Sequence, residues 1–142
     1  GRDNVEVRVI KELDEPFSHV VERRIDSIRP LFSTRMGPAI RHAVSKLEKS
    51  DSKNKILFLV SDGYPQDRDY GQDSDDKEYA LRDTEMAFVE AKRKNIVPFC
   101  LTIDAAGYDF LKEMSHDIDH KVLLDVKSLP RHLPSLYRRL TS

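Results

Sequence analysis

Two aspartates stand directly after short apolar segments of the sequence. Asp62 follows the run Ile56–Ser61. Asp104 follows the run Val97–Ile103 in the same way. Ligands of an open parallel sheet bind beyond the carboxyl ends of its strands, so both carboxylates are expected at one sheet edge. The hydroxyl of Thr34, just before a predicted helix, can approach the same edge. Because magnesium prefers such hard oxygen ligands, these residue types predict a magnesium site there.

Each of these residues also has a purely structural interpretation. Thr34 is about equally suited to cap the helix that starts near Met36. Asp62 is about equally suited to a turn that follows a strand. For Asp104, capping of the next turn is favoured over a role in the site. Residue type and spacing alone therefore leave both interpretations open for Thr34 and Asp62.

Helices and strands must alternate to position these residues, and the hydropathy pattern predicts that they do. The strict alternation over Val5–Lys11 is typical of a half-buried strand at a sheet edge. The segment Lys55–Ser61 is apolar on both faces, as in the middle of a parallel sheet. Further strands are predicted at Val97–Ile103 and Val122–Leu124, and helices at His19–Ile28, Pro38–Lys49, Lys77–Asn95, Tyr108–Met114 and Leu129–Leu140. This order predicts an α/β fold, a mostly parallel sheet with helices on both faces.

An acidic segment follows Asp62 in the sequence. It contains Asp67, Asp69, Asp73, Asp75 and Asp76. Charges in such segments are mostly solvated, and the last of them favour the start of the next helix, where Asp75 and Glu78 would form a capping box. The alternative is a surface beside the metal that contacts a protein partner. Its contact residues would be Tyr64, Asp67, Asp69 and Tyr70.

Other reactive side chains have structural interpretations. Cys100 lies in an apolar strand with no cation nearby in the sequence, so we expect a buried, inert thiol. His116 and His120 share a helical spacing but no His-Glu-x-x-His motif, which favours a surface pair over a zinc site. The sequence has no Gly-rich phosphate loop either, and this argues against nucleotide hydrolysis.

Composition excludes two classes of partner. The 142 residues include 24 Lys and Arg against 25 Asp and Glu, so no global field attracts nucleic acid. The longest apolar run, Ile56–Val60, is far too short to span a bilayer. A single cysteine rules out an internal disulfide and fits a reducing, cytoplasmic setting.

Several motifs, taken in their order and spacing, resemble one known family. They are Ser33–Gly37 with Arg41–Ala43, Ser61–Gly71, Arg82–Thr84, Pro98–Asp104, Leu129–Pro130 and Tyr137–Thr141. Together they run through nearly the whole chain and are similar to the von Willebrand factor A-type (VWA) domain of the NorD/CbbO accessory proteins. The resemblance implies a Rossmann-like VWA fold and a non-catalytic adaptor that works with a MoxR-type AAA+ ATPase.

VWA domains carry a metal-ion-dependent adhesion site (MIDAS) built from three loops, and the resemblance assigns two of its ligands. Thr34 matches the second loop and Asp62 matches the third. The Asp-x-Ser-x-Ser motif of the first loop does not occur in this sequence. Magnesium held by Thr34 and Asp62 alone would stay mostly hydrated. Mg²⁺ is therefore the cofactor expected in the intact protein, with weak binding or none in this chain.

The resemblance also implies partners. In this family an acidic side chain, from the MoxR-type ATPase or from its target enzyme, completes the coordination of the metal. The target is nitric oxide reductase or Rubisco, and Pro65–Asp67 and Ala106–Leu111 look closer to the Rubisco type. Two alternative functions are a magnesium-dependent phosphohydrolase that uses the acidic segment and a scaffold domain that binds no metal.

Residues 1–142 are expected to form a single VWA domain, the carboxy-terminal fragment of a longer protein, without the first strands of the fold. In the family those strands lie between the edge strand and the strand that ends at Asp62. Their loss would leave backbone groups of the central strand unpaired. Two arrangements that would pair these backbone groups are predicted. Either Val5–Lys11 pairs directly with Ile56–Val60, or two copies of the chain pair through the open edge.

Overall fold

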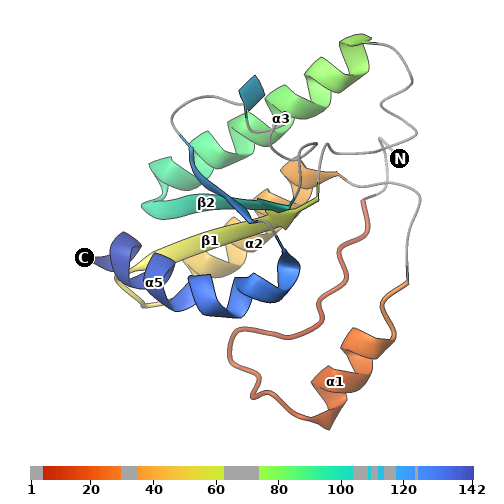
Figure 1. Ribbon diagram of the computed structural model, residues 1–142, viewed down its shortest axis with the longest axis vertical. Helices are drawn as coiled ribbons and strands as arrows, with labels where there is room; N and C mark the ends of the chain where they lie inside the picture. Colours follow the sequence, from red (N-terminus) through yellow and green to blue (C-terminus); the bar gives the residue numbers. More distant parts are fainter. Residues whose placement is uncertain are drawn as a thin grey trace.

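Helices and parallel strands alternate along most of the chain (Figure 1). The computed structural model describes residues 5–29, 35–62, 74–103, 109, 112–113, 118–123 and 125–142. Their elements are α1 (His19–Asp26), α2 (Met36–Glu48), β1 (Lys55–Ser61), α3 (Ser74–Arg93), β2 (Ile96–Ile103), β3 (Asp119–Leu123), the short 3-10 helix η2 (Val126–Ser128) and α5 (Leu129–Thr141). No helix in this part of the chain is long and apolar enough to cross a bilayer. Most of the helix predicted at Tyr108–Met114 lies outside the described residues.

The sheet is three-stranded and parallel, in the order β1-β2-β3. β1 pairs with β2 from Lys55 opposite Ile96 to Ser61 opposite Thr102. The parallel sheet predicted from the sequence is confirmed. The middle strand is β2, however, and β1 lies at one edge of the described sheet, although its two apolar faces predicted a central position.

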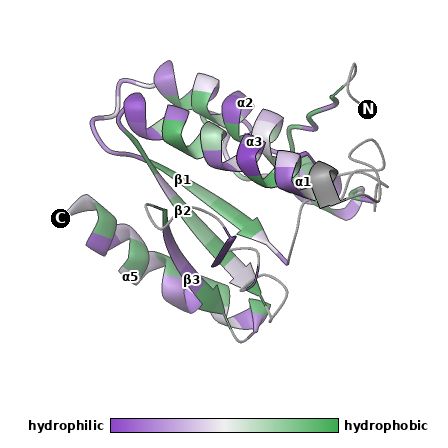
Figure 2. Ribbon diagram, turned by 90° about the horizontal axis from the view of Figure 1, so that it is seen from above, coloured by the Kyte–Doolittle hydropathy of each residue, from purple (hydrophilic) through white to green (hydrophobic). Residues whose placement is uncertain are grey.

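Helices cover both faces of the sheet, as predicted (Figure 2). On one face, α2 and α3 bury a core that includes Ile40, Val44, Phe88 and Cys100. On the other face, Leu136 of α5 packs with the β2 side chains Phe99 and Leu101 and with Leu123 of β3. Successive side chains of a strand point to opposite faces, so β2 contributes Cys100 to one core and Phe99 and Leu101 to the other. Together these layers form a Rossmann-like α/β fold.

The turn between α3 and β2 depends on Asn95. Its φ of 57° places it in the left-handed region, which asparagine tolerates better than most residues. The amides of Lys94 and Asn95 donate to the carbonyls of Ala91 and Lys92, each at 3.0 Å, and close the last turn of the helix. The chain can therefore enter β2 at Ile96, directly after this turn.

The beginning of α3 corrects one sequence prediction. The helix starts at Ser74, three residues before the predicted Lys77, so Asp75 lies inside it and the Asp75–Glu78 capping box is wrong. Acidic residues are favourable in the first turn of a helix because of its dipole, so α3 can begin before the apolar periodicity that indicated its start.

The segment before α1 is not a strand, so the prediction for Val5–Lys11 is wrong. Its alternating valines Val5, Val7 and Val9 are 40%, 40% and 41% exposed. Alternation matches the period of a strand, but a strand also needs a neighbour for its backbone groups, and the described sheet offers this segment none. The predicted pairing of Val5–Lys11 with Ile56–Val60 is wrong for the same reason.

Side chains hold this amino-terminal segment in place of a backbone ladder. Arg24 of α1 donates to both oxygens of Glu15, at 2.7 and 2.8 Å, and to the carbonyl of Ile10 at 3.1 Å. Lys46 of α2 pairs with Glu12 at 2.7 Å. These contacts connect α1 and the preceding residues to α2.

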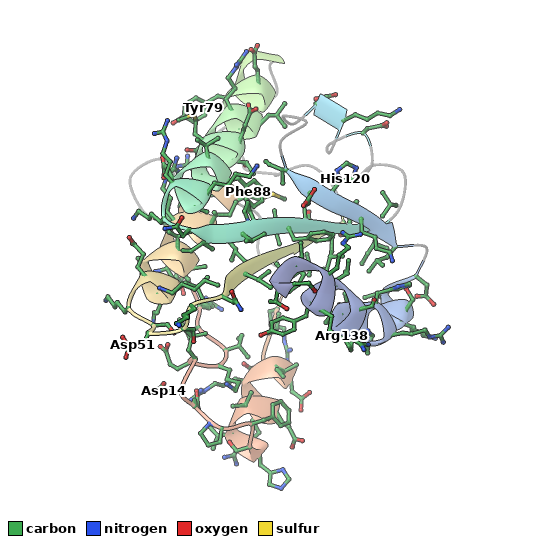
Figure 3. All side chains as sticks on the ribbon, turned by 90° about the vertical axis from the view of Figure 1, so that its left-hand side faces the viewer. Asp14, Asp51, Tyr79, Phe88, His120 and Arg138 are labelled. Carbon is green, nitrogen blue, oxygen red and sulfur yellow. The ribbon has the colours of Figure 1, made fainter. Side chains whose placement is uncertain are left out.

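Phe88 lies in the core between α3 and β2 (Figure 3), and its substitution tests the packing there. The side chain is fully buried, so Phe88→Ala should lower the free energy of unfolding by about 3–5 kcal/mol, measured by urea denaturation. Met86 is on the same helix but 47% exposed, and Met86→Ala should lower it by less than about 0.5 kcal/mol. Similar losses in the two variants would contradict this packing.

Candidate functional site

The carboxyl ends of β1 and β2 coincide at one edge of the sheet, because Ser61 lies opposite Thr102. Asp62 is the next residue after Ser61, and it is exposed. Its carboxylate makes no hydrogen bond or ion pair with any described residue. The structure therefore places Asp62 at the predicted edge with its oxygens available to a ligand. The other predicted residues, Thr34, Tyr64, Asp67, Asp69, Tyr70 and Asp104, lie outside the described residues, and their roles stay predictions.

Thr102 is a residue at this edge that the sequence did not single out. It is fully buried, and its Oγ1 has no hydrogen-bond partner. The sequence showed only a threonine in an apolar strand, which is an ordinary strand residue. Its position beside Ser61 and Asp62 depends on the pairing of β1 with β2, which the sequence does not specify residue by residue.

Arg41 joins the two helices that begin near this edge. Its Nη1 donates to Asp83 at 2.7 Å, and its Nε and Nη2 donate to the two oxygens of Glu90 at 2.8 and 3.2 Å. Glu90 and Asp83 raise the pKa of the Arg41 guanidinium, and the hydrogen bonds from Arg41 lower the pKa of Glu90. The stabilising effect of the Glu90 pairing is therefore present above the ordinary carboxyl pKa and is lost as the pH falls through the lowered value.

This ion-pair network bears on both predicted ligand segments. Thr34 precedes α2, which carries Arg41, and the acidic segment leads into α3, which carries Asp83 and Glu90. The N-cap position of α2 is Arg35. Thr34 lies outside the described residues, so a capping role for it stays a prediction. The helices that follow the two segments are thus held together by partly buried, bidentate contacts, which are stronger than an isolated surface pair.

Gly37 provides the space for the network in the first turn of α2. A Cβ atom built on Gly37 would lie 2.0 Å from Asp83 Oδ2 and 3.1 Å from Arg41 Nη1. The Asp83 carboxylate therefore lies directly against the backbone of this turn. A glycine here, which is unfavourable in most helices, is explained by this close approach.

The remaining candidate groups are Cys100 and the two histidines that the sequence analysis considered. Burial raises the pKa of the Cys100 thiol to about 12, which confirms the expectation of a buried, inert side chain. His120 lies exposed at the start of β3, and His116 lies outside the described residues. No group of three His, Cys, Asp or Glu side chains that could hold a metal occurs within the described part of the chain.

The carboxylate and hydroxyl oxygens at this edge are nevertheless chemically suitable ligands for a magnesium ion. Asp62 supplies a free carboxylate, and Thr102 supplies a buried hydroxyl without a partner one strand away. Magnesium binds through one or two carboxylates and keeps several of its waters, so few protein ligands are needed. Thr34, which lies outside the described residues, stays a predicted source of a second hydroxyl.

The fold and this edge define a VWA-type α/β domain. The family model for the von Willebrand factor type A domain matches residues 5–139, and the chain belongs to that family. Protein NorD of Brucella suis biovar 1 is 35% identical over 139 residues, which is 98% of this chain and 21% of that protein. Protein NorD of Stutzerimonas stutzeri is 36% identical over 113 residues, which is 80% of this chain and 18% of that protein.

An uncharacterised protein of Pseudomonas aeruginosa is 36% identical over 139 residues, which is 98% of this chain and 22% of that protein. The chain spans about a fifth of the length of the curated relatives that it matches. No solved structure matches the chain.

Gly37→Ala tests the contact between the Asp83 carboxylate and α2. Alanine is normally better than glycine inside a helix by about 0.8–1.0 kcal/mol. Here we expect the free energy of unfolding to fall by about 0.5–2 kcal/mol, because the new methyl group displaces Asp83 from Arg41. In an Asp83→Ala background the same substitution should raise it by up to about 1 kcal/mol. A stabilising effect of Gly37→Ala in the wild-type background would show that the contact is not made.

Proposed function

We propose that this chain is the partner-binding VWA domain of a NorD-like accessory protein and that it acts as an adaptor without catalysis. The family match over residues 5–139 and the NorD relatives, which align with 80–98% of the chain, support this class of function. The observation that carries the proposal is the unpaired, exposed carboxylate of Asp62 at the carboxyl edge of the sheet. A carboxylate there can bind a cation that an acidic partner also contacts.

Thr34 and Asp62 are proposed to hold Mg²⁺ in the adhesion site of this domain. The ion supplies positive charge and open coordination positions, and a carboxylate of the partner replaces one of its waters. Asp62 would anchor the ion from the end of β1, and Thr34, which precedes α2 in the sequence, would supply the second ligand. Arg41 keeps α2 and α3 in fixed relation. Beside the ion, the proposed contact residues with the partner are Tyr64, Asp67, Asp69 and Tyr70.

The proposed partners are a MoxR-type AAA+ ATPase and the target enzyme that it activates, in the cytoplasm. Among targets, the sequence favoured Rubisco, whereas relatives named NorD favour the nitric oxide reductase system. We therefore propose nitric oxide reductase activation ahead of Rubisco activation. Neither nucleic acid nor a membrane is part of the proposed mechanism.

Asp62→Ala should abolish magnesium-dependent binding of the chain to a MoxR-type ATPase in a pull-down with purified components. NMR shifts during a magnesium titration should also disappear around residues 61–62, because the carboxylate that is proposed to hold the ion is lost. Asp51→Ala is the matched control, since Asp51 is an exposed aspartate before the amino end of β1 (Figure 3). Binding that is insensitive to magnesium and to Asp62→Ala would instead identify a metal-free scaffold.

The free edge of β1 is proposed to pair two copies of the chain. β1 has a described neighbour only in β2, and Val60 near its end is 47% exposed. A hollow of about 270 Å³ lies between β1, α2 and the amino-terminal residues Val9 and Leu13, and another of about 340 Å³ lies where β1 approaches Tyr137 of α5. Both flank the unpaired backbone, so an added strand could bury side chains in them.

Sedimentation velocity should show a dimer of the 142-residue chain that Val60→Lys converts to a monomer, because a charged side chain on an edge strand opposes pairing. Val97→Lys is the control. Val97 is also exposed, but it lies on β2, the middle strand of the described sheet, and is paired with Ile56 of β1. A monomeric wild-type chain at micromolar concentration would contradict the proposed pairing.

A further inference from the structure

Two threonines are the buried polar residues of the described core, and they differ in one respect. Thr84 and Thr102 are both 0% exposed. The hydroxyl of Thr84, in α3, donates to the carbonyl of Ala80 at 2.8 Å. The hydroxyl of Thr102, in β2, has no partner. Thr84 is therefore satisfied by its own helix, and Thr102 is not.

The difference has a backbone origin. In a helix the carbonyl four residues earlier lies within reach of a threonine hydroxyl, as Ala80 does for Thr84. In a strand with neighbours on both sides, the ladder uses the nearby carbonyls, and Thr102 pairs with Ser61 and with Val122. A buried hydroxyl without a partner costs about 1–3 kcal/mol, so one in a native core calls for a bound water, ion or ligand as explanation.

Thr102 also lies at the position where such a ligand is expected. It is opposite the last residue of β1, and Asp62 is the next residue along that strand. Because side chains alternate along a strand, Thr102 points to the same face as Cys100, which packs in the core under α2 and α3. Its hydroxyl is thus beneath the carboxyl edge, on the face that α2 and α3 cover.

We propose that the Thr102 hydroxyl is a positioning group of this site, which donates a hydrogen bond to a water bound to the magnesium ion beside Asp62. The inference rests on the proposed function, because it assigns the donor to the same metal site. A bridging water suits the geometry, since Thr102 is fully buried below the edge whereas Asp62 is exposed on it. Magnesium retains several waters in protein sites, and groups that orient these waters strengthen its binding.

Thr102→Val is the diagnostic variant because it removes the hydroxyl and keeps the shape of the side chain. Magnesium is the probe, titrated into the full chain and followed by calorimetry and by NMR shifts at Asp62. We expect Thr102→Val to weaken magnesium binding about tenfold. Its midpoint of urea unfolding without magnesium should stay equal or rise, because an unsatisfied buried hydroxyl has been removed. Thr102→Ser should retain the affinity.

Thr84→Val is the matched control, because it deletes an equally buried hydroxyl that has a partner. It should lower the urea midpoint and leave the magnesium affinity unchanged. Wild-type affinity in Thr102→Val, with magnesium binding by the wild type intact, would overturn this inference and leave the proposed function standing. An equal loss of affinity in Thr102→Val and Thr84→Val would also overturn it, since core packing would then be the cause. No magnesium binding by the wild type would overturn the proposed metal site together with the inference.

Discussion

Seven residue pairs join β1 to β2 in parallel, from Lys55 opposite Ile96 to Ser61 opposite Thr102, and this register decides where the candidate ligands lie. It brings the ends of two strands that are 41 residues apart in sequence to one edge. Asp62 then emerges beside a buried, unsatisfied threonine hydroxyl. A shift of one residue would turn Thr102 or Ser61 to the opposite face and separate these oxygens. Strand pairing is thus the constraint on which the candidate site depends.

The helices above that edge are held by electrostatics as much as by apolar packing. Their buried side chains, such as Ile40 and Phe88, bring α2 and α3 together without strong directional preference. Arg41 adds direction, because its planar guanidinium reaches Asp83 and Glu90 at fixed angles. Gly37 makes the first of these contacts possible by leaving room for the carboxylate. The two helices are therefore held in a fixed relation, which suits the proposed role of an adaptor that presents a fixed surface to a partner.

Much of the fold was predictable from local patterns. The apolar runs that became β1 and β2 and the periodic segment that became α5 were identified nearly to the residue. The failures share a cause, which is that the missing information was not local. Val5–Lys11 has the alternation of a strand but finds no neighbouring strand in the described sheet. β1 has the two apolar faces of a central strand and lies at an edge. Side-chain pattern reports what a segment could bury, not what lies next to it.

The sequence by itself determined the alternation of helices and strands, the α/β class, the family resemblance and the position of Asp62 at a strand end. These follow from periodicity, from motifs and from the chain connection between a strand and the next residue. Only the tertiary structure decided that Thr102 lies beside Ser61 without a hydrogen-bond partner and that Arg41 reaches two acids more than forty residues away. Hydrogen bonding and burial at such positions are properties of the neighbours, which are set by packing between distant segments and leave no local trace.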